Sequence, residues 1–113
     1  MSKSLNFHNV KKRYLTVTLA DENDTTIMVG TPTKAIFNDL MVLQSSVEAL
    51  KDDESDNEAL DDLYNACARI MSRNKAGKKI TKDFLEEIFD FEDIMIFFRA
   101  YIDFVSEISN SKN

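Results

Sequence analysis

Apolar and polar residues alternate along the first part of the chain. Leu15, Val17 and Leu19 are separated by single polar residues, and this period of two is typical of a strand with one buried face. A second run of β-forming residues, 25–29, follows a short acidic segment. The pattern predicts a β-hairpin within about residues 11–30. Because a lone hairpin is marginally stable in water, we expect it to pack on the helices or to pair with strands of another subunit.

From residue 36 onward, the spacing of apolar residues is that of amphipathic helices. The first stripe repeats every three or four positions: Ile36, Leu40, Leu43, Val47 and Leu50. The second stripe follows an acidic segment: Leu60, Leu63, Cys67 and Ile70. A short helix is expected near 82–89 and a long one near 91–109. We therefore predict an α+β fold, mainly helical, with the hairpin followed by about four helices within 32–109.

Capping residues mark where these helices begin and end. Thr31 is expected to cap the first helix, and Pro32 is expected to occupy its first helical position. Thr81 and Asp90 are expected to cap the third and fourth helices. Gly77 suits the left-handed turn that follows a helix.

Composition narrows the class of protein. The chain has 113 residues and two glycines, which favours one mainly helical domain, 1–113. Its formal charge of -6 disfavours binding to nucleic acid through phosphates. No leader peptide and no run of about 20 uncharged apolar residues is visible, so we expect no membrane association.

Candidate sites for chemistry are weak, and we expect neither catalysis nor a metal nor a cofactor. The acidic segment 52–62 lacks the glycine and the final glutamate of a calcium loop. His8 is the only histidine and has no pattern of partners, so we interpret it as a surface residue. Cys67, the only cysteine, stands on an apolar stripe and is expected to be a buried thiol. The basic segment 73–82 is interpreted as a charged turn, although it could contact phosphates.

The strongest signal is the apolar band near the C-terminus. Six of the eight phenylalanines fall between Phe84 and Phe104, interleaved with carboxylates. The band is wider than the usual core-facing arc of a helix, so we expect part of it to remain uncovered and to bind another polypeptide. The expected partner-binding residues are Phe89, Phe91, Met95, Ile96, Ile102 and Phe104. Self-association into a homo-oligomer is expected on the same ground.

Four stretches together resemble a known family. They are 11–19 (KKRYLTVTL), 28–33 (MVGTPT), 70–81 (IMSRNKAGKKIT) and 89–93 (FDFED). In this order, and over nearly the whole chain, the sequence is similar to the tail assembly chaperones of long-tailed phages and prophages of Gram-positive bacteria.

The resemblance implies a function without catalysis. Such chaperones bind the long, apolar tape measure protein in the host cytoplasm and keep it soluble until tail tube subunits polymerise around it. They are absent from the mature virion. Many also have a longer frameshifted form that joins the short form during assembly, and this chain would be the short form. The family has no fixed binding motif, so no residue role is carried over.

Two other functions stay open at this point. The chain could be a structural tail or connector component that remains in the virion, with its hairpin adding strands to a ring of subunits. It could instead be a small nucleic-acid-binding regulator that uses residues 73–82, which the net charge disfavours.

Overall fold

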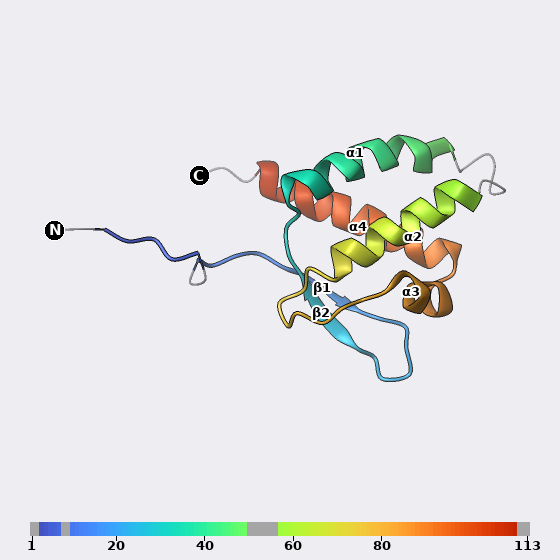
Figure 1. Cartoon of the computed structure of the whole chain (residues 1–113), viewed down its shortest axis with the longest axis horizontal. Helices are drawn as coiled ribbons and strands as arrows, with labels where there is room; N and C mark the ends of the chain where they lie inside the picture. Colours follow the sequence, from blue (N-terminus) through green and yellow to red (C-terminus); the bar gives the residue numbers. More distant parts are fainter. Residues whose placement is uncertain (1–2, 8–9, 50–56, 111–113) are drawn as a thin grey trace.

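Two short strands precede four helices in the computed structural model of the chain (Figure 1). The structure describes residues 3–7, 10–49 and 57–110. The elements are β1 (Leu15–Thr18), β2 (Thr26–Val29), α1 (Lys34–Ala49), α2 (Asn57–Met71), α3 (Lys82–Ile88) and α4 (Phe91–Asn110). The predicted α+β fold, a hairpin followed by four helices, is confirmed.

The hairpin has one face in the core and one face in solvent. β1 and β2 are antiparallel, with Leu15 opposite Val29 and Thr18 opposite Thr26. Leu19, Ile27 and Val29 are buried, whereas the threonines of both strands are exposed. This is the alternation that the sequence predicts for a half-buried strand.

The turn of the hairpin is held by one aspartate. The Asp21 carboxylate accepts hydrogen bonds from the backbone N–H of Thr25, at 2.8 Å, and from its hydroxyl, at 2.6 Å. These bonds favour the ionised carboxylate and lower the pKa of Asp21. Asp24 takes the left-handed conformation that the tight turn requires, with φ of 47°.

The segment after α2 covers the outer edge of β2. The Gly30 N–H donates to the Arg73 carbonyl at 2.9 Å, and the Lys75 N–H donates to the Met28 carbonyl at 2.9 Å. The amide side chain of Asn74, which is buried, ties this segment together through bonds to the backbone of Met71 and Lys78.

Gly77 lies in the turn that follows, with φ of +72°, a backbone conformation that costs glycine little. The prediction of a left-handed glycine at this place is confirmed.

Two of the predicted helix caps are confirmed and one is wrong. Thr81 accepts from the Phe84 N–H at 3.1 Å. Asp90 and Asp93 cap α4 reciprocally, each carboxylate accepting from the other's backbone N–H. The first helix is capped by Thr33 and not by Thr31, because α1 begins at Lys34 and the Thr33 hydroxyl accepts from the Ile36 N–H at 3.3 Å.

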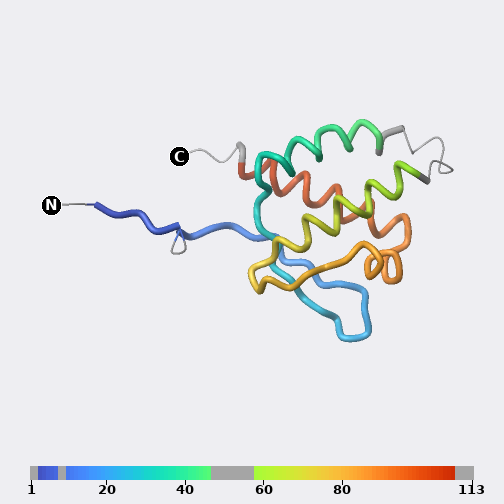
Figure 2. The backbone as a smooth tube through the Cα atoms, viewed as in Figure 1, coloured from blue at the N-terminus to red at the C-terminus, as the bar shows by residue number. Residues whose placement is uncertain are grey.

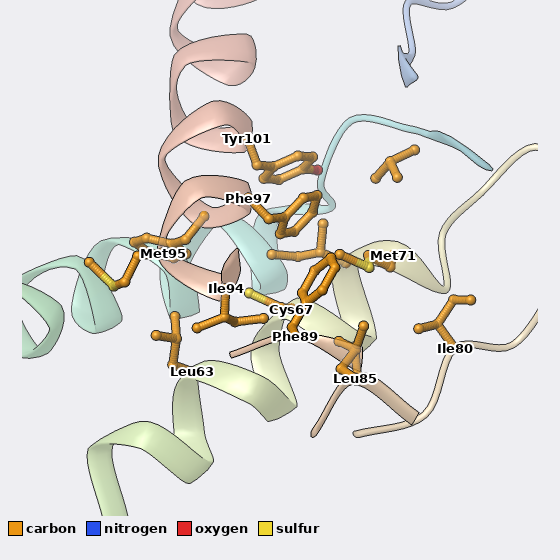
Figure 3. Close-up of a cluster of buried hydrophobic side chains, with 14 of the residues drawn as sticks. Leu63, Cys67, Met71, Ile80, Leu85, Phe89, Ile94, Met95, Phe97 and Tyr101 are labelled. Carbon is orange, nitrogen blue, oxygen red and sulfur yellow. The ribbon is translucent and has the colours of Figure 1, made fainter. Parts of the chain in front are cut away.

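A single core joins the hairpin to the helices. Figure 1 shows α1 lying beside α2 on the outer side of the helical group, with α4 passing behind both. In Figure 3, Leu63 and Cys67 of α2 lie close to Ile94 of α4. A long-range hydrogen bond fixes α4 to the end of β2: the Tyr101 hydroxyl donates to the Gly30 carbonyl at 2.8 Å.

Candidate partner-binding surface

Most of the C-terminal apolar band is covered by the fold itself. Among the six residues expected to bind a partner, Phe89, Met95 and Phe104 are at most 9% exposed. Two more, Phe91 and Ile102, pack half-buried against the core. The expectation that these residues form an uncovered surface is therefore wrong for most of the band.

The physical reason is that α4 has neighbours on several sides. Figure 3 shows Met95 and Phe97 pointing to opposite sides of the helix, and both side chains are buried. The Tyr101 ring stacks on Phe97 and lies beside Phe104, with centroid distances of 6.0 Å and 5.9 Å. A helix surrounded in this way buries a wider arc than one that rests on a single neighbour.

Ile96 is the exception among the six. It is 64% exposed and stands on the polar face of α4, near Arg99 and Asp103. One exposed apolar residue among charged ones is ordinary for a protein surface and does not by itself indicate a binding site.

Another uncovered group of apolar side chains lies on α1, outside the C-terminal band. Phe37 is 36% exposed, Met41 39% and Val42 72%. Phe37 and Met41 are four residues apart and therefore project from the same side of the helix. Leu40 and Leu43, on the neighbouring side, are buried in the core.

A shallow apolar hollow adjoins this side of α1. It has a volume of about 350 Å³ and is bounded by the loop before α1, by Phe37, and by Val105 and Ile108 near the end of α4. Pro32 adds another apolar wall, and Lys34 stands at the rim. We call Pro32, Phe37, Met41, Val105 and Ile108 the α1 surface. The C-terminal band contributes to it through Val105 and Ile108, not through the residues that the sequence singled out.

The opposite side of α1 is mixed, because exposed Val42 stands there among polar and charged side chains. There, Arg69 of α2 donates to the Asp39 carboxylate at 2.8 Å, and both side chains are more than half exposed. The hollow beside this ion pair is lined by the carboxylates of Asp39 and Asp62 as well as by Val42 and Ala66, so this side of α1 is more polar than the side with Phe37 and Met41. Of the two sides of α1, the α1 surface is the more apolar one.

Three cations of the basic segment 73–82 make contacts inside the chain. Arg73 donates to the Thr31 carbonyl at 3.2 Å, and the Lys75 ammonium lies 5.7 Å from the centre of the Tyr14 ring. Lys82 bridges Asp61 and Glu86, at 3.4 Å and 3.3 Å. The contacts of these three cations agree with the interpretation of the segment as a charged turn between helices.

Cys67 is completely buried, and burial raises the pKa of its thiol well above the usual range. The predicted burial of the Cys67 thiol is confirmed, and a buried thiol with a raised pKa is a poor nucleophile. His8 and residues 52–56 of the acidic segment lie outside the described residues. Within the described part of the chain, no three His, Cys, Asp or Glu side chains stand close enough together to hold a metal ion.

Comparison with known proteins identifies no family. No protein-family model matches the sequence, and neither a curated protein nor a solved structure is significantly similar to it. Across residues 3–7, 10–49 and 57–110, no helix has both the length and the apolar character needed to cross a bilayer.

Proposed function

We propose that this protein is a phage tail assembly chaperone that binds the tape measure protein and keeps it soluble before the tail tube forms. The observation that carries the proposal is the α1 surface, an apolar face on an otherwise strongly charged small domain. The choice of the tape measure protein as the client rests on the resemblance of four stretches of the sequence to phage tail assembly chaperones. The proposed activity is binding alone, without catalysis or a cofactor.

The α1 surface fits the apolar face of a client helix. Phe37 and Met41 form a ridge beside a hollow whose walls are the side chains of Val105 and Ile108. An amphipathic helix can lay its apolar side chains into such a groove at helical spacing. Because the area is small, each contact would be weak, and many copies would be needed along a long client.

The charge of -6 supports the same proposal. Net charge keeps a protein with an exposed apolar face soluble, and it keeps complexes of the protein with an apolar client soluble as well. Weak contacts also allow tail tube subunits to displace the chaperone. On this proposal the protein acts in the host cytoplasm together with a longer frameshifted form and is absent from the finished virion.

Co-expression with fragments of the tape measure protein tests the proposal. The fragments come from the phage or prophage that carries the gene for this chain, and the readouts are their soluble fraction and their co-purification with it. We expect the wild-type chain to keep at least one fragment soluble. The double variant Phe37→Asp/Met41→Asp is expected to bind that fragment at least about tenfold more weakly, as for loss of an apolar hot spot.

The matched control is Ile96→Asp, which places the same charge on an exposed apolar position of α4. It is expected to bind the fragment like the wild type. Thermal unfolding of each variant shows whether the fold is intact. If no fragment becomes soluble with the wild-type chain, the chaperone function is wrong. If Ile96→Asp is as defective as the double variant, the client does not bind chiefly at the α1 surface.

A second function, a structural component retained in the tail, is favoured by one observation. The outer edge of β1 has no strand beside it among the described residues, and an exposed sheet edge can accept a strand from another subunit. Mass spectrometry of purified virions separates the two functions. A chaperone should be missing from them, whereas a structural component should be present in fixed stoichiometry.

A further inference from the structure

The two edges of the hairpin differ in how their backbone groups are satisfied. The Leu19 N–H donates to the Thr25 carbonyl at 2.7 Å, so in this register every second residue, Val17 and Leu15, also bonds across to β2. Thr16 and Thr18 therefore direct their N–H and C=O groups away from β2. Within the part of the chain that the structure describes, nothing else pairs with them, and both residues are exposed.

The edge of β2 is treated differently. The segment 73–75 covers it through bonds to Gly30 and Met28. β1 instead follows directly from the extended segment 10–14, which leads away from the body of the protein (Figure 2). The fold thus protects one edge of its two-stranded sheet and leaves the other open, and an open edge is a template for pairing with another strand.

We propose that two copies of this chain pair antiparallel along β1 and form a continuous four-stranded sheet. In the pairing we assign, Val17 of each copy lies at the two-fold axis. Thr16 of one copy then faces Thr18 of the other, and each such pair exchanges two backbone hydrogen bonds. An isologous contact of this kind closes with two copies. The pairing does not depend on the client proposed above.

Charge selects both the partner and the register. Three cations, Lys11–Arg13, precede β1, and carboxylates at Asp21 and Glu22 follow it. In an antiparallel pair, the start of one strand faces the end of the other, so this chain complements itself. With Val17 at the axis, the basic segment 11–13 of one copy runs towards the acidic turn of the other copy, which contains Asp21 and Glu22. Opposite charges in these two segments attract one another.

The contact is small, and this sets its strength. Each β1 has only four residues, and interfaces below about 1,000 Å² are weak or transient. Self-association is therefore expected at protein concentrations from about 10 μM to about 1 mM, and added salt should weaken it because the cross-strand charges are exposed to solvent.

Proline substitution tests the open edge. Thr16→Pro removes an N–H that has no partner within the hairpin, so the hairpin should persist while the edge is blocked. Met28 lies directly opposite Thr16, on the protected edge, and Met28→Pro is the matched control. In sedimentation velocity, Thr16→Pro is expected to raise the dimer dissociation constant at least tenfold, and Met28→Pro to leave it within about twofold. A wild-type chain that is monomeric at all these concentrations, or a Thr16→Pro variant that dimerises normally, overturns the proposal.

Charge exchange tests the register with variants that leave the strand unchanged. Lys12→Glu and Glu22→Lys should each weaken self-association, because each brings like charges close together where the segment before β1 meets the turn of the other copy. An equimolar mixture of the two variants should form a heterodimer, since residues 12 and 22 of the two copies then carry opposite charges at both ends of the contact. If the mixture associates no better than either variant alone, the assigned register is wrong.

Cysteine cross-linking locates the axis independently. Val17→Cys should form a disulfide with its own counterpart under mild oxidation, because the two residues face each other at the axis. Thr16→Cys, whose counterpart is displaced along the strand, should cross-link more slowly. Cys67 is buried and does not compete. Faster cross-linking at residue 16 or 18 than at residue 17 would overturn the assigned axis.

Discussion

Helices α4 and α1 carry comparable apolar side chains but bury them to very different extents. On α4, where most residues are apolar, Ile94, Phe98 and Tyr101 are at most 2% exposed. On α1, the apolar residues are fewer, yet Val42 is 72% exposed and Met41 39%. The density of apolar residues along a sequence therefore does not reveal which helix has an uncovered face.

The difference follows from position in the fold. α4 packs against α2 and is tied to the end of the hairpin by the Tyr101 hydroxyl. α1 packs mainly on α2 and lies on the outer side of the helical group (Figure 1). A helix with neighbours on several sides, such as α4, buries a wide apolar arc. A helix on the outside of the helical group, such as α1, leaves even a narrow apolar band partly exposed. The search for a client surface therefore belongs on α1.

The largest expected effect separates two residues that the sequence placed in one partner-binding set. Phe104→Ala should lower the free energy of unfolding by about 3–5 kcal/mol, because it opens a cavity beside the Tyr101 ring. Ile96→Ala should change it by no more than about 0.5 kcal/mol, because that side chain is exposed. Urea denaturation measures both values. Similar values for the two variants would mean that α4 is not buried as described.

The next effect concerns the bond that fixes α4 to the hairpin. Tyr101→Phe keeps the packing of the ring but leaves the Gly30 carbonyl without its donor, which should cost about 1–2 kcal/mol. Tyr14→Phe is the matched control, because its ring lies at the surface beside Lys75. Urea denaturation at pH 7 is expected to show a loss for residue 101 only. If both variants lose the same free energy of unfolding, the loss comes from removing any tyrosine hydroxyl and not from this particular hydrogen bond.

The same hydroxyl gives a dependence on pH. Burial raises the pKa of Tyr101 from its usual value of 10 to about 12. In the unfolded chain the hydroxyl ionises near pH 10, while in the folded protein it stays protonated, so its contribution is present below pH 10 and is lost as the pH rises towards 12. The wild type should therefore lose more stability than Tyr101→Phe between these pH values. Parallel pH profiles for the two proteins would contradict the burial of the hydroxyl.

Local features of the fold could be predicted from the sequence because their causes are local. The alternation at Leu15–Leu19 identified β1, and Thr81 and Asp90 marked the starts of α3 and α4. Each depends on residues only a few positions apart. The misplaced cap at Thr31 is also instructive: the Thr31 carbonyl accepts from Arg73, a contact that no local pattern contains.

The exposed surface could not be predicted in the same way. Whether Met95 or Phe104 is buried depends on elements far away in the sequence, as the 71-residue separation of Gly30 and Tyr101 illustrates. One signal was present: Phe37 and Met41 stand four residues apart, beside the stripe that contains Leu40 and Leu43. These two residues widen the apolar band of α1 and so indicate an uncovered edge. The signal is weak, because the band contains one phenylalanine whereas the C-terminal band contains six.

The smallest expected effect tests how α1 is attached. If buried Leu40 and Leu43 hold α1 in place, the exposed ion pair between Asp39 and Arg69 contributes little. Asp39→Asn should then lower the free energy of unfolding by no more than about 0.5–1 kcal/mol, and the difference should vanish in about 1 M salt. Asp62→Asn is the matched control, since it removes an exposed carboxylate beside the same hollow. A loss above about 2 kcal/mol for Asp39→Asn alone would mean that the ion pair, and not the apolar stripe, fixes α1, since exposed pairs rarely contribute so much.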